Sequence, residues 1–184
     1  MIATVFLPIG TLLFLLTLVI GHAYAGWEEA LHVPFSQWRD GPYSVFGYVN
    51  FILLLACSLL ILVLIIRQRL RSDIITAVSI VLLLFIVMIT PSKDAFHRYS
   101  SYVLFLLLMG YYTWVLWRWN ARNVIVHLAV LLALTLLTAW HSYGLWQKAL
   151  VLYMLVLMNI HGLHLYIQTK RHALDIIPSK ETVK

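Results

Sequence analysis

The sequence predicts an all-α, polytopic membrane protein: one bundle of six transmembrane helices with both termini in the cytoplasm. Three observations lead to this prediction. The 184-residue chain is 62% hydrophobic and only 11% charged, which is more apolar surface than a soluble domain of this size can bury. Its apolar residues form six long continuous runs. Its Lys and Arg residues gather at alternate ends of those runs, as topology signals do.

Each run is long enough to cross a hydrocarbon core of about 30 Å at about 1.5 Å per residue. We expect helices because the runs are continuously apolar and do not alternate as barrel strands do. In chain order the helices are expected at about residues 2–22, 46–66, 73–90, 98–118, 123–141 and 147–169. Together they form a membrane domain, residues 1–170, followed by a polar cytoplasmic tail, residues 171–184.

The first run ends near Ala23-Tyr24-Ala25, which has the small-residue pattern of a signal-peptidase site. No Lys or Arg precedes the run, whereas a signal peptide has a basic start. We therefore expect an uncleaved membrane helix. The connectors at 67–72 and 119–122 are short, so the helices that each one joins should be antiparallel neighbours.

The orientation follows from the thirteen basic residues. With both termini inside, nine of them face the cytoplasm and four face outward, as the positive-inside rule requires. The nine are Arg67, Arg69, Arg71, Arg118, Arg122, Lys170, Arg171, Lys180 and Lys184, and the four are Arg39, Lys93, Arg98 and Lys148. The net charge of +6 therefore indicates topology and contact with lipid headgroups, not a nucleic-acid partner.

The long connector at 23–45 lies on the outer side in this topology. Trp27, Leu31, Phe35 and Trp38 recur in it at helical spacing, which predicts an amphipathic segment that packs on the bundle. Pro34 must break or kink that helix.

The chain contains no Gly-rich phosphate loop, GxSxG, HExxH or paired cysteines, and its single cysteine cannot form an intrachain disulfide. Candidate sites are therefore sought among polar residues near the membrane helices. The segment TPSKDAFHRYSSY, residues 90–102, is the first. Asp94 and His97 lie three residues apart in it, and could act as a catalytic acid–base pair, bind a zinc-like cation, or simply cap a helix.

Other polar residues of the outer side complete this candidate site. The expected ligand-binding residues are His22, Glu28, Glu29, His32 and His141. For a divalent metal, the candidate ligands are Asp94 and His97 together with His22 and His141, because imidazole nitrogens and carboxylate oxygens are the ligands that zinc-like cations take.

A second group lies at the inner side. It contains His127 on the fifth expected helix and His161 and His164 on the sixth. Histidines on facing helices could be axial ligands of haem b. They could also bind a metal, or form structural hydrogen bonds across helices.

Three stretches together resemble a known family: PFSQWRDGPYSVFGYVN, TPSKDAFHRYSSY and HSYGLWQKALVLYMLVLMNIHGLHLY. The chain resembles the Frag/DRAM/Sfk superfamily of six-span membrane proteins, in its uncharacterised bacterial branch. The resemblance implies a functional region at the outer side and no particular reaction. The residues that match its pattern are Ser36, Pro91, Asp94, His97, Gly144, Gln147 and Lys148. His161 and His164 are not explained by it.

The leading hypothesis is a polar His/Asp site that opens to the outer leaflet and binds or modifies a lipid or another amphiphile. One alternative is a haem b redox protein that uses the histidines of the last two helices. The other is a non-catalytic helical subunit of a membrane complex. The expected partners are membrane lipids and other membrane subunits, and the expected location is a bacterial inner membrane or its equivalent.

Overall fold

The computed structural model describes residues 2–42, 44–68, 70–138 and 142–175, which form helices and turns without any strand. Two short helices, α2 (Trp27–His32) and the 3₁₀ helix η1 (Phe35–Asp40), lie in the predicted outer connector. The other six helices are long and apolar enough to cross a membrane, which is compatible with an integral membrane protein. They are α1 (Ile2–Ala25), α3 (Ser44–Arg67), α4 (Arg71–Ile89), α5 (Ala95–Trp119), α6 (Ala121–Thr138) and α7 (Tyr143–Asp175).

The expected helix boundaries are close to the observed ones, but helix α7 differs clearly. It begins four residues earlier than expected, at Tyr143, and continues to Asp175. Residues 171–175, which were assigned to a polar tail, are therefore helical, while 176–184 lie outside the described residues. The expected end of the fifth helix, at 141, also lies outside them.

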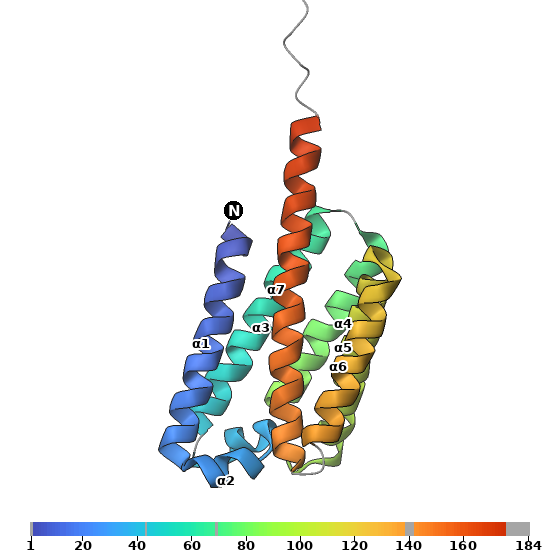
Figure 1. The fold of residues 1–184 in the computed structure, drawn as a ribbon. Helices are drawn as coiled ribbons and strands as arrows, with labels where there is room; N and C mark the ends of the chain where they lie inside the picture. Colours follow the sequence, from blue (N-terminus) through green and yellow to red (C-terminus); the bar gives the residue numbers. More distant parts are fainter. Residues whose placement is uncertain (1, 43, 69, 139–141, 176–184) are drawn as a thin grey trace, which may run out of the picture.

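The six long helices form one bundle (Figure 1). Each contacts the next long helix along the chain, and α7 also contacts α1 and α3. Helix α1 begins and α7 ends at the same end of the bundle, which we call the terminal end. Helix α2 lies at the opposite end, which we call the loop end.

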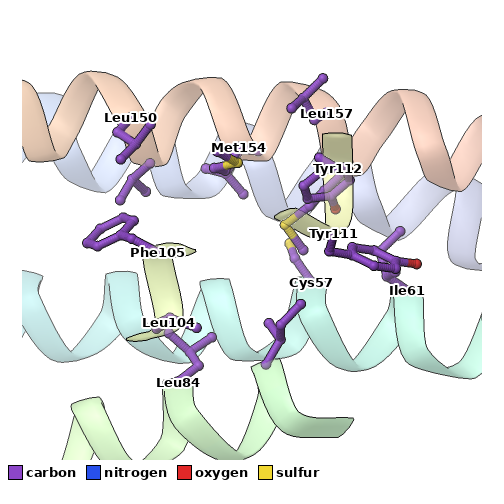
Figure 2. Close-up of a cluster of buried hydrophobic side chains, with 14 of the residues drawn as sticks. Cys57, Ile61, Leu84, Leu104, Phe105, Tyr111, Tyr112, Leu150, Met154 and Leu157 are labelled. Atoms are coloured by element: carbon purple, nitrogen blue, oxygen red, sulfur yellow. The ribbon is translucent and has the colours of Figure 1, made fainter. Parts of the chain in front are cut away.

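The core is built from aliphatic and aromatic side chains, several of which Figure 2 shows between helices α3, α4, α5 and α7. Cys57 is buried in it as a free thiol. Among the most deeply buried side chains are Leu7, Phe14, Ile65, Val115 and Leu155. Apolar side chains elsewhere on the long helices, above all on α6, are exposed, as expected of surfaces that face lipid.

The connector packs onto the loop end, as predicted. Trp38 is 0% exposed, although Trp27 remains 55% exposed. Helix α2 ends before Pro34, and η1 starts after it, so proline breaks the segment as expected. Two glycines permit the close approach. A Cβ at Gly47 would lie 2.6 Å from the backbone nitrogen of Arg39, and one at Gly144 would overlap the backbone of His32.

Candidate binding cavity at the loop end

A cavity of about 410 Å³, which we call the polar cavity, lies where η1, the α4–α5 connection, α5 and α7 meet. Ten of its eleven lining residues are polar, among them two cations, and none is acidic. Lys93 and Arg98 are exposed, so the cavity reaches the surface. The lining residues are Pro34, Ser36, Gln37, Ser92, Lys93, His97, Arg98, Ser101, Tyr102, Tyr143 and Gln147.

The helical repeat explains how α5 and α7 supply this lining. His97 and Ser101 are four residues apart on α5, as are Tyr143 and Gln147 on α7. Residues at this spacing lie on one face of a helix. Each helix thus presents polar residues of its first two turns to the cavity, and the two turns that follow are mainly apolar.

A second cavity of about 60 Å³, the apolar cavity, lies between α3, α4, α5 and α7. Its walls are mainly aliphatic and aromatic side chains, such as Leu104, Phe105 and Met154. Three residues, Ser36, Ser101 and Gln147, line both cavities. We call these three residues the neck, because they stand where a polar space adjoins an apolar one.

Three buried polar atoms at the polar cavity lack a hydrogen-bond partner: Nε2 of His97, Oγ of Ser101 and Oε1 of Gln147. Buried polar atoms are normally paired, and each exception calls for an explanation. The hydrogen bond at Nδ1 of His97 shows which ring nitrogen carries the proton. The Thr90 hydroxyl donates to the Ile86 carbonyl at 2.8 Å, so it accepts from His97 Nδ1 at 3.2 Å. In a neutral imidazole, Nε2 is then an acceptor.

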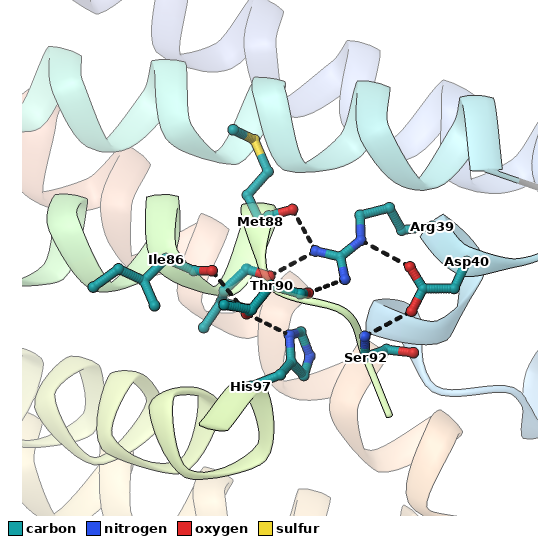
Figure 3. A network of polar contacts seen from close by, with 8 residues as sticks. Arg39, Asp40, Ile86, Met88, Thr90, Ser92 and His97 are labelled. Atoms are coloured by element: carbon teal, nitrogen blue, oxygen red, sulfur yellow. Dashed lines mark hydrogen bonds and ion pairs between the residues drawn. The ribbon is translucent and has the colours of Figure 1, made fainter. Parts of the chain in front are cut away.

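Arg39 fixes the geometry of this region (Figure 3). Its guanidinium donates to the carbonyl of Val87 at 2.8 Å and also to those of Met88 and Thr90. These are carbonyls at the end of α4, which have no partner within the helix, and a cation there also complements the helix dipole. The arginine is only 3% exposed, so it ties η1 to α4 from within the protein.

Asp40 extends this tie to the α4–α5 connection. Its carboxylate accepts from the backbone N–H of Ser92 at 2.6 Å and from Nε of Arg39 at 3.2 Å. Burial raises the pKa of Asp40, but the hydrogen bonds from Ser92 and the neighbouring Arg39 outweigh it, so the pKa is lowered from its usual value.

Lys148 holds the other part of the connector. Its ammonium donates to the carbonyls of Ala30 and, at 2.9 Å, of Val33, near the end of α2. It also lies 5.0 Å from the ring centroid of Trp38, within range of a cation–π contact. His22 packs on the same tryptophan, with ring centroids 4.7 Å apart.

The structure separates the residues of the predicted outer site. His97 lines the polar cavity. Asp94 is exposed and caps α5 by accepting from the N–H of Phe96 at 2.9 Å. The Nδ1 of His22 instead contacts the carbonyl of Leu18 at 2.7 Å. Asp94 thus caps α5 while His97 is hydrogen-bonded to Thr90, and their role as an acid–base pair stays a prediction.

The remaining predicted residues lie elsewhere or are not described. Glu28 and His32 border an open hollow beside Trp27, separate from the polar cavity. His141 and the side chain of Glu29 lie outside the described part of the chain. Within that described part, no three His, Cys, Asp or Glu side chains are grouped to hold a metal ion. The metal site stays a prediction.

The inner histidines lie among aromatic and polar side chains. His127 Nδ1 is 2.7 Å from the Tyr153 hydroxyl. His161 is buried, and the rings of Tyr111, Tyr112 and Trp119 surround it at centroid distances of 5.8, 6.1 and 5.8 Å.

The ring of His164 packs at a tilt against that of Trp119, with the ring centroids 4.3 Å apart. The contacts of all three histidines are those of polar groups packed between helices, and the haem alternative stays a prediction.

Sequence reasoning overlooked several residues that matter here. Arg39 and Lys148 were counted as topology signals, although both are buried and bind helix-end carbonyls. Gln147 entered only through the resemblance, and Ser101 did not enter at all. A signal for Ser101 and Gln147 was present in the sequence. Each is the second of two polar residues spaced i and i+4 near the start of a mainly apolar helix.

Comparisons with protein-family models, with curated proteins and with solved structures find no match to this chain. The resemblance to the six-span superfamily is therefore still a prediction. Five of its residues lie at the polar cavity or contact the connector: Ser36, His97, Gly144, Gln147 and Lys148.

Proposed function

We propose that the two cavities form one binding site for an amphiphile. The observation that carries the proposal is the neck: the same three residues line a polar space that reaches the surface and an apolar space inside the bundle. A ligand with a polar end and a narrow apolar end would fit a polar cavity that leads to an apolar one. Small-molecule sites commonly combine apolar walls with a few well-placed polar groups.

The apolar cavity sets the thickness of the ligand. At about 10–15 Å³ per water-sized position, its 60 Å³ holds roughly four to six positions. That is room for part of a single chain, not for two chains side by side. Its lining runs from Ser101 to Leu108 along α5, a length on the order of 10 Å at about 1.5 Å per residue.

The proposed site binds its ligand without a chemical step. Among the described residues, His97 is the imidazole that lines the polar cavity, and its Nδ1 is hydrogen-bonded to Thr90. Asp94, the expected partner, is committed to the helix cap. A general base needs an orienting group and a reacting partner within hydrogen-bond reach, and the lining of the cavity supplies no carboxylate for that role.

We further propose that the loop end faces the outside of the cell and that the terminal end faces the cytoplasm, in agreement with the nine-to-four bias of basic residues. Cysteines introduced at Gln37 and at Ser72 test this orientation, because they lie at opposite ends of the bundle. Only the first should react with an impermeant thiol reagent added to intact cells. Reaction of the second from outside would reverse the proposed orientation.

Binding can be tested with an uncharged probe, N-hexanoylglycinamide, titrated calorimetrically into the protein in phosphatidylcholine nanodiscs, with empty nanodiscs as the blank. We expect saturable binding, and at least tenfold weaker binding of N-acetylglycinamide, which lacks the chain. Ser101→Val should weaken hexanoyl binding about tenfold because it fills the neck. Ser100→Val is the matched control, since Ser100 is equally buried but lines neither cavity. Equal effects of the two variants would contradict the proposal.

A further inference from the structure

The lining of the polar cavity carries charge of one sign only. Lys93 and Arg98 both border it, and among the described residues no Asp or Glu does. Among the described residues the ion pairs are Arg39–Asp40 and Arg118–Asp73, so neither cavity cation is paired with a carboxylate. Two unpaired cations beside a cavity favour an anionic group in it.

The unpaired buried atoms add a second, independent requirement. Nε2 of His97 is an acceptor, because in the neutral ring the proton is on Nδ1, which donates it in a hydrogen bond to the Thr90 hydroxyl. Oε1 of Gln147 is also an acceptor, and Oγ of Ser101 can accept as well. All three belong to side chains of the polar cavity, and two of them are neck residues. A ligand that satisfies them must bring an N–H or O–H donor to the neck.

These two requirements occur at different depths of one site. Lys93 and Arg98 are exposed at the surface, whereas Ser101 and Gln147 are buried at the neck. Resting on the proposed binding function, we infer that the ligand is an anionic single-chain amphiphile whose carboxylate or phosphate meets Lys93 and Arg98. An N–H or O–H donor between this anionic group and the chain bonds to His97 and Gln147. An acyl chain linked to an anionic headgroup by an amide has this order of anion, donor and chain, and so does one with a hydroxyl between the headgroup and the chain.

A matched series of probes separates the charge from the donor. N-hexanoylglycine carries both, N-hexanoylglycinamide lacks the charge, and N-hexanoylsarcosine keeps the charge but replaces the N–H by N–CH₃. Titrated into the same nanodiscs, the first should bind about tenfold more tightly than either of the others. The advantage over the glycinamide should shrink as salt is raised, because the cations are exposed and therefore screened.

Variants assign each effect to its residues. Lys93→Gln with Arg98→Gln should remove the preference for the acid, so that N-hexanoylglycine and its glycinamide bind this variant with about equal affinity. The control, Arg122→Gln with Lys170→Gln, changes the net charge equally at exposed positions away from the cavity, and should keep the preference. Gln147→Met, close in volume, should reduce the discrimination between glycine and sarcosine probes.

The outcomes separate this inference from the function on which it rests. Equal affinity for N-hexanoylglycine and its glycinamide would overturn the charge assignment, while the chain-dependent binding of both would uphold the amphiphile site. Equal affinity for the glycine and sarcosine probes would overturn the donor assignment. If N-acetylglycine binds as tightly as N-hexanoylglycine, the cavity is an anion site only, and the proposed function fails together with the inference.

Discussion

The two ends of the bundle both bury polar groups, but they differ in the space beside them. At the loop end, unpaired atoms of His97, Ser101 and Gln147 border a cavity of about 410 Å³. In the half of the bundle towards the terminal end, the unpaired hydroxyl of Tyr111 borders a cavity of about 20 Å³, which is room for about one water. Unpaired polar atoms beside a cavity of ligand size support the proposed binding site, whereas beside so small a space they are a local packing feature.

The charged groups of the two ends differ in the same way. At the terminal end, the carboxylate of Asp73 is 1% exposed and pairs with Arg118, whose side chain is 32% exposed. At the loop end, the buried charges are cations, Arg39 and Lys148, which bind backbone carbonyls. Buried charge therefore holds helices together at both ends, while the exposed cations of the loop end remain available to a ligand.

The largest effect is expected for Arg39→Met. It removes the donors to three carbonyls of α4 and the Nε–H that Asp40 accepts, so we expect a loss of about 3 kcal/mol in the free energy of unfolding. Arg98→Met, which removes an exposed cation, should cost less than about 0.5 kcal/mol. Thermal unfolding of both variants in one detergent makes the comparison, and equal losses would contradict the role assigned to Arg39.

At the terminal end, the two partners of one ion pair should respond unequally. Arg118→Leu leaves the buried carboxylate of Asp73 uncompensated, at a cost of about 3 kcal/mol. Asp73→Asn should cost only about 1 kcal/mol in the free energy of unfolding, because the long side chain of Arg118 can extend to the water at the membrane surface. Chemical unfolding in mixed micelles measures both. A larger loss for Asp73→Asn would show that the pair is not held as described.

Glycines sharpen the contrast between the connector contact and the bundle surface. Gly144→Ala would push a Cβ into the backbone of His32, and overpacking of this kind costs about 1–3 kcal/mol. Gly110→Ala meets no atom within 4 Å and should stabilise α5 by about 0.5–1 kcal/mol, as helix propensity predicts. The unfolding midpoint should fall for Gly144→Ala and rise for Gly110→Ala. A higher midpoint for Gly144→Ala would rule out the close contact.

The smallest effect concerns pH at the loop end. The pKa of Asp40 is lowered in the folded protein. Its contribution to stability is therefore complete above its unfolded-state pKa and is lost as the pH falls through the folded-state value. Asp40→Asn should reduce the acid sensitivity of the melting temperature between about pH 5 and 3. An unchanged pH profile would contradict the hydrogen bonds assigned to this carboxylate.

The sequence predicted the six spans and the buried connector well because both depend on patterns that composition reveals: long apolar runs, and Trp38 at helical spacing. A helix cap was one of the three roles considered for Asp94, and the structure shows that cap; the assignment of His97 to a site stays a prediction. It could not predict that Arg39 would bind the end of α4, because that contact joins residues about fifty positions apart. The same holds for the neck, where η1, α5 and α7 each contribute one residue.

The central claim is that the chain of the ligand enters the apolar cavity through the neck. N-acylglycine with a diazirine at the end of its six-carbon chain tests this directly, by photolabelling in nanodiscs and peptide mass spectrometry. We expect labels on Leu104 and Met154, which line the apolar cavity, and their loss in Ser101→Val. Labels confined to Leu106 and Val156, which are exposed on the same two helices, would show that the probe only dissolves in lipid and would contradict the account.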